Sequence, residues 1–425
     1  MNTRIYNARL MTMEKDCSIQ ENGEVWIRDD TIAYAGPERP TNCIFDREIN
    51  ADGNLVMPGF KNAHTHSAMT FLRSFADDLP LSQWLNQQVF PMEAKLTKED
   101  VYVLSKLANL EYLTSGITAN YDMYLFPLET AKASAEMGFR TVLCSGLNNF
   151  SSSLAQVEQD YKTLNHFHPL ISYQIGFHAE YTTSPELLQG LSALAHRLSA
   201  PVSTHCSETE NEVQGCIERY GMTPPAYLHS LGMFDYGGTC FHCVHVTRED
   251  LELFARQGVF IVTNPGSNAK LASGIAPLTD MLDCGISVGI GTDGPASNNC
   301  LDFFREMFLA TAFQKIRLKD AAALDAEQVL RMAVTNGAHA MGLSDCDCLA
   351  PGKRADFILI DLHQPNMQPL NHIAKNIVYS GSKQNVKMTM INGQILYEDG
   401  HFHAGCDPEE IYRQANRIIR RMQED

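Results

Sequence analysis

Positive charge is scarce in this sequence. Lys and Arg total 33 against 50 Asp and Glu, which gives a formal net charge of -17. A surface with this excess of negative charge repels phosphate backbones and anionic lipids. We therefore expect a small-molecule substrate and neither nucleic acid nor a membrane as a partner, while a homo-oligomer stays open.

Long apolar runs and export features are also missing. The sequence contains no stretch of ~18 apolar residues, the length that a membrane-spanning helix needs. Residues 1–13 include Arg4 and Arg9 and no apolar core, unlike a secretory signal. The 12 cysteines lack the spacing of a disulfide framework and are typical of reduced thiols. We expect a cytoplasmic protein.

The middle of the chain alternates apolar runs with helical patterns. Several runs are rich in Val and Ile and end in polar residues or Gly and Pro, which is typical of buried parallel strands. The eight runs are Asn54–His66, Gly116–Met123, Phe139–Leu147, Ile171–His178, Pro201–Cys206, Thr239–His245, Gly258–Asn264 and Ile286–Asp293. This order predicts an α/β fold, a (β/α)8 TIM-like barrel, whose working site lies at the C-terminal ends of the strands.

The two ends of the chain have a different sequence pattern from the middle. They contain short alternating segments broken by turn dipeptides such as Asn22-Gly23 and Asn392-Gly393, followed by an amphipathic helix from Glu409. We expect the two ends to pair into one small β-sandwich domain. The predicted division is 1–56 and 351–425 for that domain, and 57–350 for the barrel.

The first barrel run ends in two histidines. His64 and His66 are two residues apart, so on a strand both imidazoles lie on one face and point into the barrel mouth. Two imidazoles in this arrangement are suited to bind one metal ion. An isolated His-x-His is as often a pair of surface histidines, but the strand end favours ligands.

Two further runs end in residues of the same kind. His205 closes the fifth run and Glu208 follows three residues later, near enough to reach a metal-bound water. Asp293 closes the eighth run and can add a carboxylate ligand. Each pattern alone also fits a plain turn or a core residue. Their convergence on the strand ends predicts a metal-dependent hydrolase.

The sixth run carries His242. Strand alternation predicts that His242 shares the inward face with Cys240 and Val244. A hydrogen-bonded core histidine is the alternative, and it suits His245 better than His242.

With these motifs the sequence resembles the amidohydrolase superfamily, and within it the 5'-methylthioadenosine/S-adenosylhomocysteine deaminases. The resemblance covers nearly the whole chain. It rests on the His64 and His66 motif, Trp84, Glu93, the segment 242–245, Asn264–Leu271, Gly291–Asn299 and Gly352–Asp356.

The resemblance implies a role for each matching residue. His64, His66, His205 and Asp293 would hold one divalent metal, Zn²⁺ or alternatively Fe²⁺. Glu208 would shuttle protons and contact the substrate, and His242 would orient the attacking water. The implied substrate contacts are those of His178, Trp84 and Glu93, with Glu93 on the ribose hydroxyls.

The implied reaction is hydrolytic deamination of an adenine nucleoside in purine salvage. A metal lowers the pKa of its bound water toward ~7, which gives a nucleophile for C6 of the purine. Asp293 would take the water proton, Glu208 would protonate the ring nitrogen, and ammonia would leave.

Other enzymes stay open as alternatives. Deaminases of other aminopurines or pterins and chlorohydrolases use nearly the same ligands. A two-metal amidohydrolase usually needs a lysine on the fourth strand, and 171–181 has none. Zinc cytidine-type deaminases use the motifs H-x-E and P-C-x-x-C. In this chain His178-Ala179-Glu180 and Cys240–Cys243 are similar to them, but Thr239 stands in place of the proline.

A relative without catalytic activity is a further alternative. Such a protein would have lost a metal ligand or the proton shuttle Glu208, and this chain contains all of them.

One departure from the family concerns the 5' end of the substrate. Members that accept S-adenosylhomocysteine place arginines after the third strand, whereas this chain has Ser145 there and no Lys or Arg from Ser145 to Asp160. We therefore expect a preference for an uncharged 5' end, as in 5'-methylthioadenosine, 5'-deoxyadenosine or adenosine.

Overall fold

The central sheet of the protein is a parallel barrel of eight strands. The structure, a computed structural model, describes residues 2–75, 77–79 and 83–424. The strands follow chain order: β6 (Phe60–Thr65), β7 (Ile117–Met123), β8 (Arg140–Cys144), β9 (Ile171–Ala179), β10 (Val202–Cys206), β11 (Gly238–His242), β12 (Val259–Thr263) and β13 (Val288–Ile290). The chain after β13 returns to β6, where the Asp293 N–H donates to the His64 carbonyl at 3.0 Å. The predicted barrel is confirmed.

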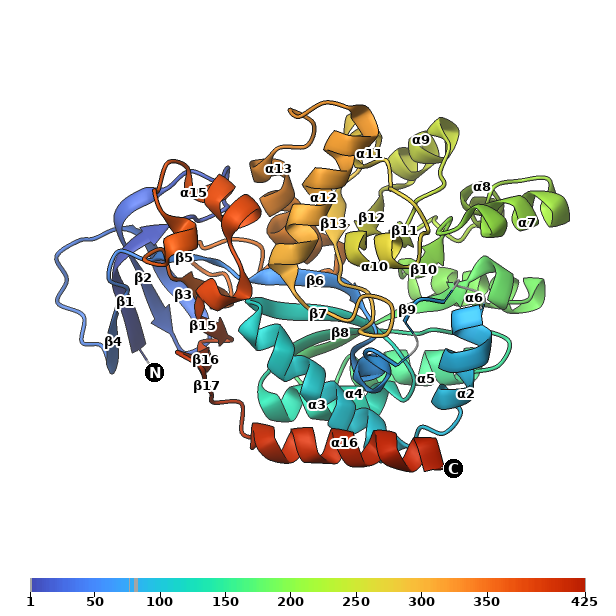
Figure 1. The fold of residues 1–425 in the computed structure, drawn as a ribbon, viewed down its shortest axis with the longest axis horizontal. Helices are drawn as coiled ribbons and strands as arrows, with labels where there is room; N and C mark the ends of the chain where they lie inside the picture. The colour runs from blue at the N-terminus through green and yellow to red at the C-terminus, as the bar shows by residue number, and fades with distance from the viewer. Residues whose placement is uncertain (1, 76, 80–82, 425) are drawn as a thin grey trace.

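Helices cover the outside of the barrel (Figure 1). The helices between strands include α3 (Lys98–Thr114), α4 (Pro127–Met137), α5 (Leu154–Leu164), α6 (Pro185–Leu198), α7 (Glu210–Tyr220), α8 (Pro224–Ser230), α9 (Arg248–Gln257), α10 (Pro265–Lys270), α11 (Leu278–Asp283) and α12 (Phe303–Leu318). Thr97 and Thr247 cap α3 and α9 through hydrogen bonds with Asp100 and Asp250, which fixes where these helices begin.

The helical segment over 326–340 is divided into three parts. It consists of α13 (Ala326–Arg331), a π-helical turn η4 (Met332–Asn336) and α14 (Gly337–Ala340). The last helix, α16 (Pro408–Glu424), lies across α3 (Figure 1), and Arg421 pairs with Asp100 at 2.6 Å. Among the described helices, none is long and apolar enough to cross a membrane.

The two ends of the chain form one sheet of nine strands. Its order is β17-β16-β15-β14-β5-β1-β2-β3, with β4 on β1. The strands are β1 (Asn2–Leu10), β2 (Gln20–Arg28), β3 (Thr31–Pro37), β4 (Arg47–Asn50), β5 (Leu55–Pro58), β14 (Phe357–Ile360), β15 (Val386–Ile391), β16 (Gln394–Glu398) and β17 (His401–Phe402). The predicted pairing of the termini is therefore present, while the division at 56/57 and 350/351 stays a proposal.

One predicted strand is wrong in its extent. The sequence predicts one barrel strand over the run Asn54–His66, but β5 belongs to the terminal sheet and only β6 belongs to the barrel. The break is at Gly59, where a Cβ atom would lie 2.1 Å from Thr118 Cγ2. Glycine there lets the chain pass close to β7 as it leaves one sheet for the other.

A buried ion pair joins the two sheets. Arg140 Nε of β8 donates to Asp356 Oδ2 at 2.6 Å and Nη2 donates to Oδ1 at 3.1 Å. The side chains are 6% and 0% exposed. Arg140→Met is expected to lower the free energy of unfolding by ~3–5 kcal/mol, because it leaves a buried carboxylate unpaired.

Urea denaturation of both proteins measures this difference. Arg197→Met is the matched control, because Arg197 pairs with Glu158 in solvent, with the two side chains 58% and 31% exposed. Equal losses for the two variants would contradict a special role of the buried pair.

Candidate metal and active site

Three imidazoles face one another at the C-terminal end of the barrel. His64 of β6 is fully buried and stacks on Phe241 of β11, with ring centroids 3.8 Å apart. The His64 ring lies 4.9 Å from His66 and 4.8 Å from His205 of β10. Asp293 follows β13 and brings its Oδ1 to 3.3 Å from His66 Nε2 and 3.6 Å from His64 Nε2. The four predicted ligands are therefore together.

The chemistry of this cluster fits a divalent metal. Two overlapping sets, His64 with His205 and His242 and His64 with His66 and Asp293, each keep their ligand atoms within 4.8 Å of one another. Neither ring nitrogen of His64 has a hydrogen-bond partner among the described residues, although both are buried. A buried polar group without a partner is costly, and a metal ion would supply that partner.

Burial also favours the metal-binding form of His64 and His205. It holds the pKa of His64 and of His205 well below the ordinary value. A neutral imidazole is the form that binds a metal.

Outer hydrogen bonds fix the orientation of the ligands. His66 and His205 turn Nδ1 to the carbonyls of Met123 and His178, so Nε2 of each ring faces the cluster. Asp293 Oδ2 accepts hydrogen bonds from the hydroxyls of Ser267 at 2.5 Å and Ser297 at 2.9 Å. Contacts of this kind hold ligand atoms in place for a metal.

His242 reaches the site by a route that differs from the prediction. Alternation along β11 places Phe241 against His64 inside the barrel, whereas Cys240 packs in the large hydrophobic cluster with residues of the surrounding helices. His242 therefore does not share its face with Cys240. Its backbone has φ 70°, followed by φ 48° at Cys243, so the chain turns sharply and swings the His242 ring into the mouth.

Glu208 lies at the edge of the cluster and outside both ligand sets. Its Oε2 is 3.9 Å from His242 Nε2, and its Oε1 accepts the Ser273 hydroxyl at 3.3 Å. His242 Nε2 is also 4.0 Å from Asp293 Oδ2. Two carboxylates and one imidazole thus surround the same small region, an arrangement suited to moving protons.

The predicted substrate residues lie at different distances from this region. Glu93 ends α2 (Phe90–Glu93) and accepts the Tyr124 hydroxyl at 2.7 Å, and burial raises its pKa. The Tyr124 ring is 6.3 Å from His66, which links Glu93 to the cluster. His178 lies 4.9 Å from His205, and burial lowers its pKa to about 4.

Trp84 is placed differently. It begins η2 (Trp84–Val89) and packs in an apolar cluster that includes Phe71 and Leu72. Its indole nitrogen is buried and has no hydrogen-bond partner in the described part of the chain. Trp84 therefore belongs to this apolar cluster and not to the group of histidines.

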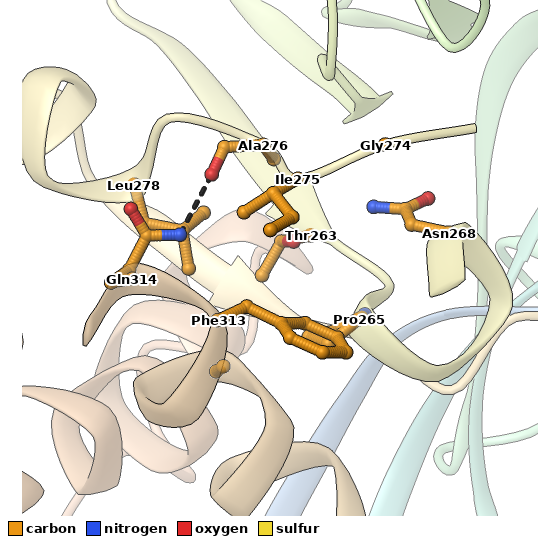
Figure 2. A pocket seen from close by; sticks show the side chains of 10 residues that line it. Thr263, Pro265, Asn268, Gly274, Ile275, Ala276, Leu278, Phe313 and Gln314 are labelled. Atoms are coloured by element: carbon orange, nitrogen blue, oxygen red, sulfur yellow. Dashed lines mark hydrogen bonds between the residues drawn. The ribbon is translucent and has the colours of Figure 1, made fainter. Parts of the chain in front are cut away.

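Four residues at the site were missed by sequence reasoning: Tyr124, Asn268, Ser273 and Glu212. Asn268 Oδ1 lies 2.8 Å from His242 Nδ1. Figure 2 shows Asn268 at the edge of a mainly apolar pocket between the segment after β12 and α12, where Gln314 donates to the Ala276 carbonyl at 2.8 Å. The metal-ligand cluster is not part of that lining.

The pieces that suggested a cytidine-type zinc site have other surroundings. Glu180 is buried and pairs with Arg219 at 2.6 Å. Cys240 and Cys243 are buried in the hydrophobic core. Neither set of candidate ligands around His64 includes them.

Comparisons with known proteins agree with this geometry. The amidohydrolase family matches residues 55–396. A 5-methylthioadenosine/S-adenosylhomocysteine deaminase of Caldanaerobacter subterraneus is 38% identical over 99% of both chains. A crystal structure of a zinc-bound adenosine deaminase from Xanthomonas campestris superposes with a TM-score of 0.95, at 31% identity over 100% of this chain and 99% of the other.

A more distant structure shares the fold alone. An atrazine chlorohydrolase of Arthrobacter aurescens in complex with zinc gives a TM-score of 0.91 at 22% identity, over 98% of this chain and 100% of the other.

Proposed function

Because this chain belongs to the amidohydrolase family, we propose that it removes the 6-amino group of an adenine nucleoside by hydrolysis, giving the inosine analogue and ammonia. The observation that carries the proposal is the placement of Glu208 beside the cluster of His64, His66, His205 and Asp293. The names of the similar deaminases supply the substrate class. Another heteroaromatic ring, as in other aminopurine deaminases or chlorohydrolases, is the second candidate.

His64, His66, His205 and Asp293 hold one divalent ion in this proposal, with Zn²⁺ preferred and Fe²⁺ as the alternative. The zinc in the similar adenosine deaminase supports this choice. A metal ion in such a site supplies water that is activated for attack at neutral pH.

The remaining residues move protons and hold the substrate. Asp293 accepts a proton, Glu208 delivers one to the purine ring nitrogen, and His242 Nε2, within 4.0 Å of both carboxylates, orients the reactants. Glu93 accepts hydrogen bonds from the ribose hydroxyls at the carboxylate oxygen that does not contact Tyr124. His178 and Trp84 complete the contacts with the substrate.

A panel of substrates tests the proposal. The protein is incubated with 5'-methylthioadenosine, 5'-deoxyadenosine, adenosine, guanine, a pterin and a chlorotriazine, and release of ammonia or chloride is measured. The highest kcat/KM is expected for an adenine nucleoside. A higher value for any of the last three compounds would replace the proposed substrate class with the second candidate.

The 5' end of the substrate is expected to be uncharged. The Ser145 hydroxyl donates to the Gly176 carbonyl at 2.6 Å and so is engaged with the backbone. Lys162 of α5 and Arg197 of α6, the cations that follow Ser145 on these two helices, both pair with Glu158. A substrate carboxylate would lack a charge-assisted partner there.

S-Adenosylhomocysteine is therefore expected to have a lower kcat/KM than 5'-methylthioadenosine, by on the order of 10-fold or more. Its carboxyl methyl ester is the matched control and should recover part of the loss. An equal or higher kcat/KM for the free acid would contradict the specificity and leave the deaminase proposal intact.

A further inference from the structure

The carboxylate of Glu212 has an unusual environment. It is buried at the start of α7, and no ion pair joins it to a cation among the described residues. Thr209 caps the helix, with its hydroxyl accepting the Glu212 N–H at 3.2 Å. In a capping box the side chain at this position would accept the backbone N–H of the cap residue. Asp100 does so for Thr97.

Glu212 instead reaches past the cap to the loop after β10. Its Oε1 accepts the Ser207 N–H at 2.6 Å, and its Oε2 accepts the Glu208 N–H at 2.8 Å. Ser207 has φ 52°, a left-handed conformation, and this turn points two successive N–H groups the same way. Such a pair forms a concave site for an anion. The carboxylate of Glu212 occupies that site.

The loop held by Glu212 is the one that carries Glu208. On its other side, the Ser207 carbonyl accepts the His245 N–H at 2.9 Å, and Ser273 holds the Glu208 side chain. The backbone of Glu208 is therefore fixed before its side chain extends toward His242. Burial raises the pKa of Glu212, and the hydrogen bonds that its two oxygens accept from the Ser207 and Glu208 N–H groups lower it. With both oxygens engaged in this way, the contact needs a side chain that offers two acceptors.

We propose that Glu212 is a positioning residue that sets the direction of the Glu208 carboxylate through the backbone of Ser207 and Glu208. This inference rests on the proposed function, in which Glu208 moves a proton. A displacement of about 1 Å at a reacting group can cost on the order of 100-fold in rate, so a loosened loop would be visible in turnover.

Glu212→Gln tests the clamp with almost no change in shape. The glutamine side chain offers one accepting oxygen for one backbone N–H. Its NH2 group faces the other backbone N–H and cannot accept a hydrogen bond from it. Turnover is expected to fall on the order of 10- to 100-fold at unchanged metal content and little changed KM. Glu210→Gln is the matched control: it removes an exposed carboxylate from the same first turn of α7. Its kcat should stay near that of the unaltered enzyme.

A double-mutant cycle identifies the route of the effect. If Glu212 acts through Glu208, Glu212→Gln should change kcat very little when Glu208 is already Gln. An equal loss in both backgrounds would overturn the proposal. Should Glu212→Gln fail to fold, Glu212→Asp, which keeps two accepting oxygens, takes its place in the cycle under the same criterion.

Hydrogen–deuterium exchange at single amides provides a readout without substrate. The amides of Ser207 and Glu208 are expected to exchange faster in Glu212→Gln than in Glu210→Gln. Unchanged exchange at both amides would overturn the clamp, whatever the substrate is. Failure of the substrate panel with faster exchange would instead overturn the proposed function alone.

Discussion

Replacing Glu208 by glutamine is expected to lower turnover of an adenine nucleoside at least ~100-fold while the metal content stays at one ion per chain. Glutamine has nearly the same shape but cannot deliver a proton. Glu208 lies outside both sets of metal-ligand atoms, yet its Oε2 is 3.9 Å from His242 Nε2. The loss should therefore appear in the chemical step.

Steady-state kinetics and elemental analysis of the same preparation measure both quantities. Glu210→Gln serves as the control for loss of a carboxylate near the start of α7. Near-normal kcat in a metal-replete Glu208→Gln protein would remove Glu208 from the mechanism. Loss of the metal would show instead that Glu208 supports the metal site.

His64→Asn is expected to have the largest effect of any single change. His64 belongs to both sets of ligand atoms, and its two ring nitrogens have no other hydrogen-bond partner among the described residues. Without a metal, water keeps its pKa near ~15.7 and is a weak nucleophile at neutral pH. Turnover should fall on the order of 1000-fold or more, and the metal content well below one per chain.

The control for His64→Asn is His196→Asn. His196 is 42% exposed on α6 and pairs with Asp235 at 2.9 Å. Its replacement should leave metal content and kcat unchanged. A His64→Asn protein that retains both a full equivalent of metal and normal turnover would contradict the proposed ligand set.

The barrel and the residues at its strand ends could be predicted because both follow from local patterns. Buried parallel strands produce apolar runs, and a polar residue at the end of such a run lies at the mouth. His64, His66, His205 and Asp293 all follow this rule, and the structure brings them together. These patterns could not locate the end of β5, since the passage between the two sheets depends on the close approach of Gly59 to Thr118.

The rest of the site depends on backbone turns and distant contacts. Strand alternation failed at His242, because its left-handed φ interrupts the two-residue period. Ser273 and Glu208 are 65 residues apart in sequence, and Tyr124 and Glu93 are 31 apart. No local pattern pairs such residues. Glu212 looks like an ordinary residue of a first helical turn until its two contacts with the loop are seen.

The most direct test of the account is a metal titration of the metal-free protein. Zn²⁺, and Fe²⁺ under anaerobic conditions, are added in steps while ammonia release from 5'-methylthioadenosine is recorded. A single site of three histidines and one aspartate predicts that activity rises linearly and levels off at one metal ion per chain, with the 5'-methylthioinosine product formed in equal amount to ammonia. Full activity without metal, or a plateau only at two ions per chain, would contradict the account.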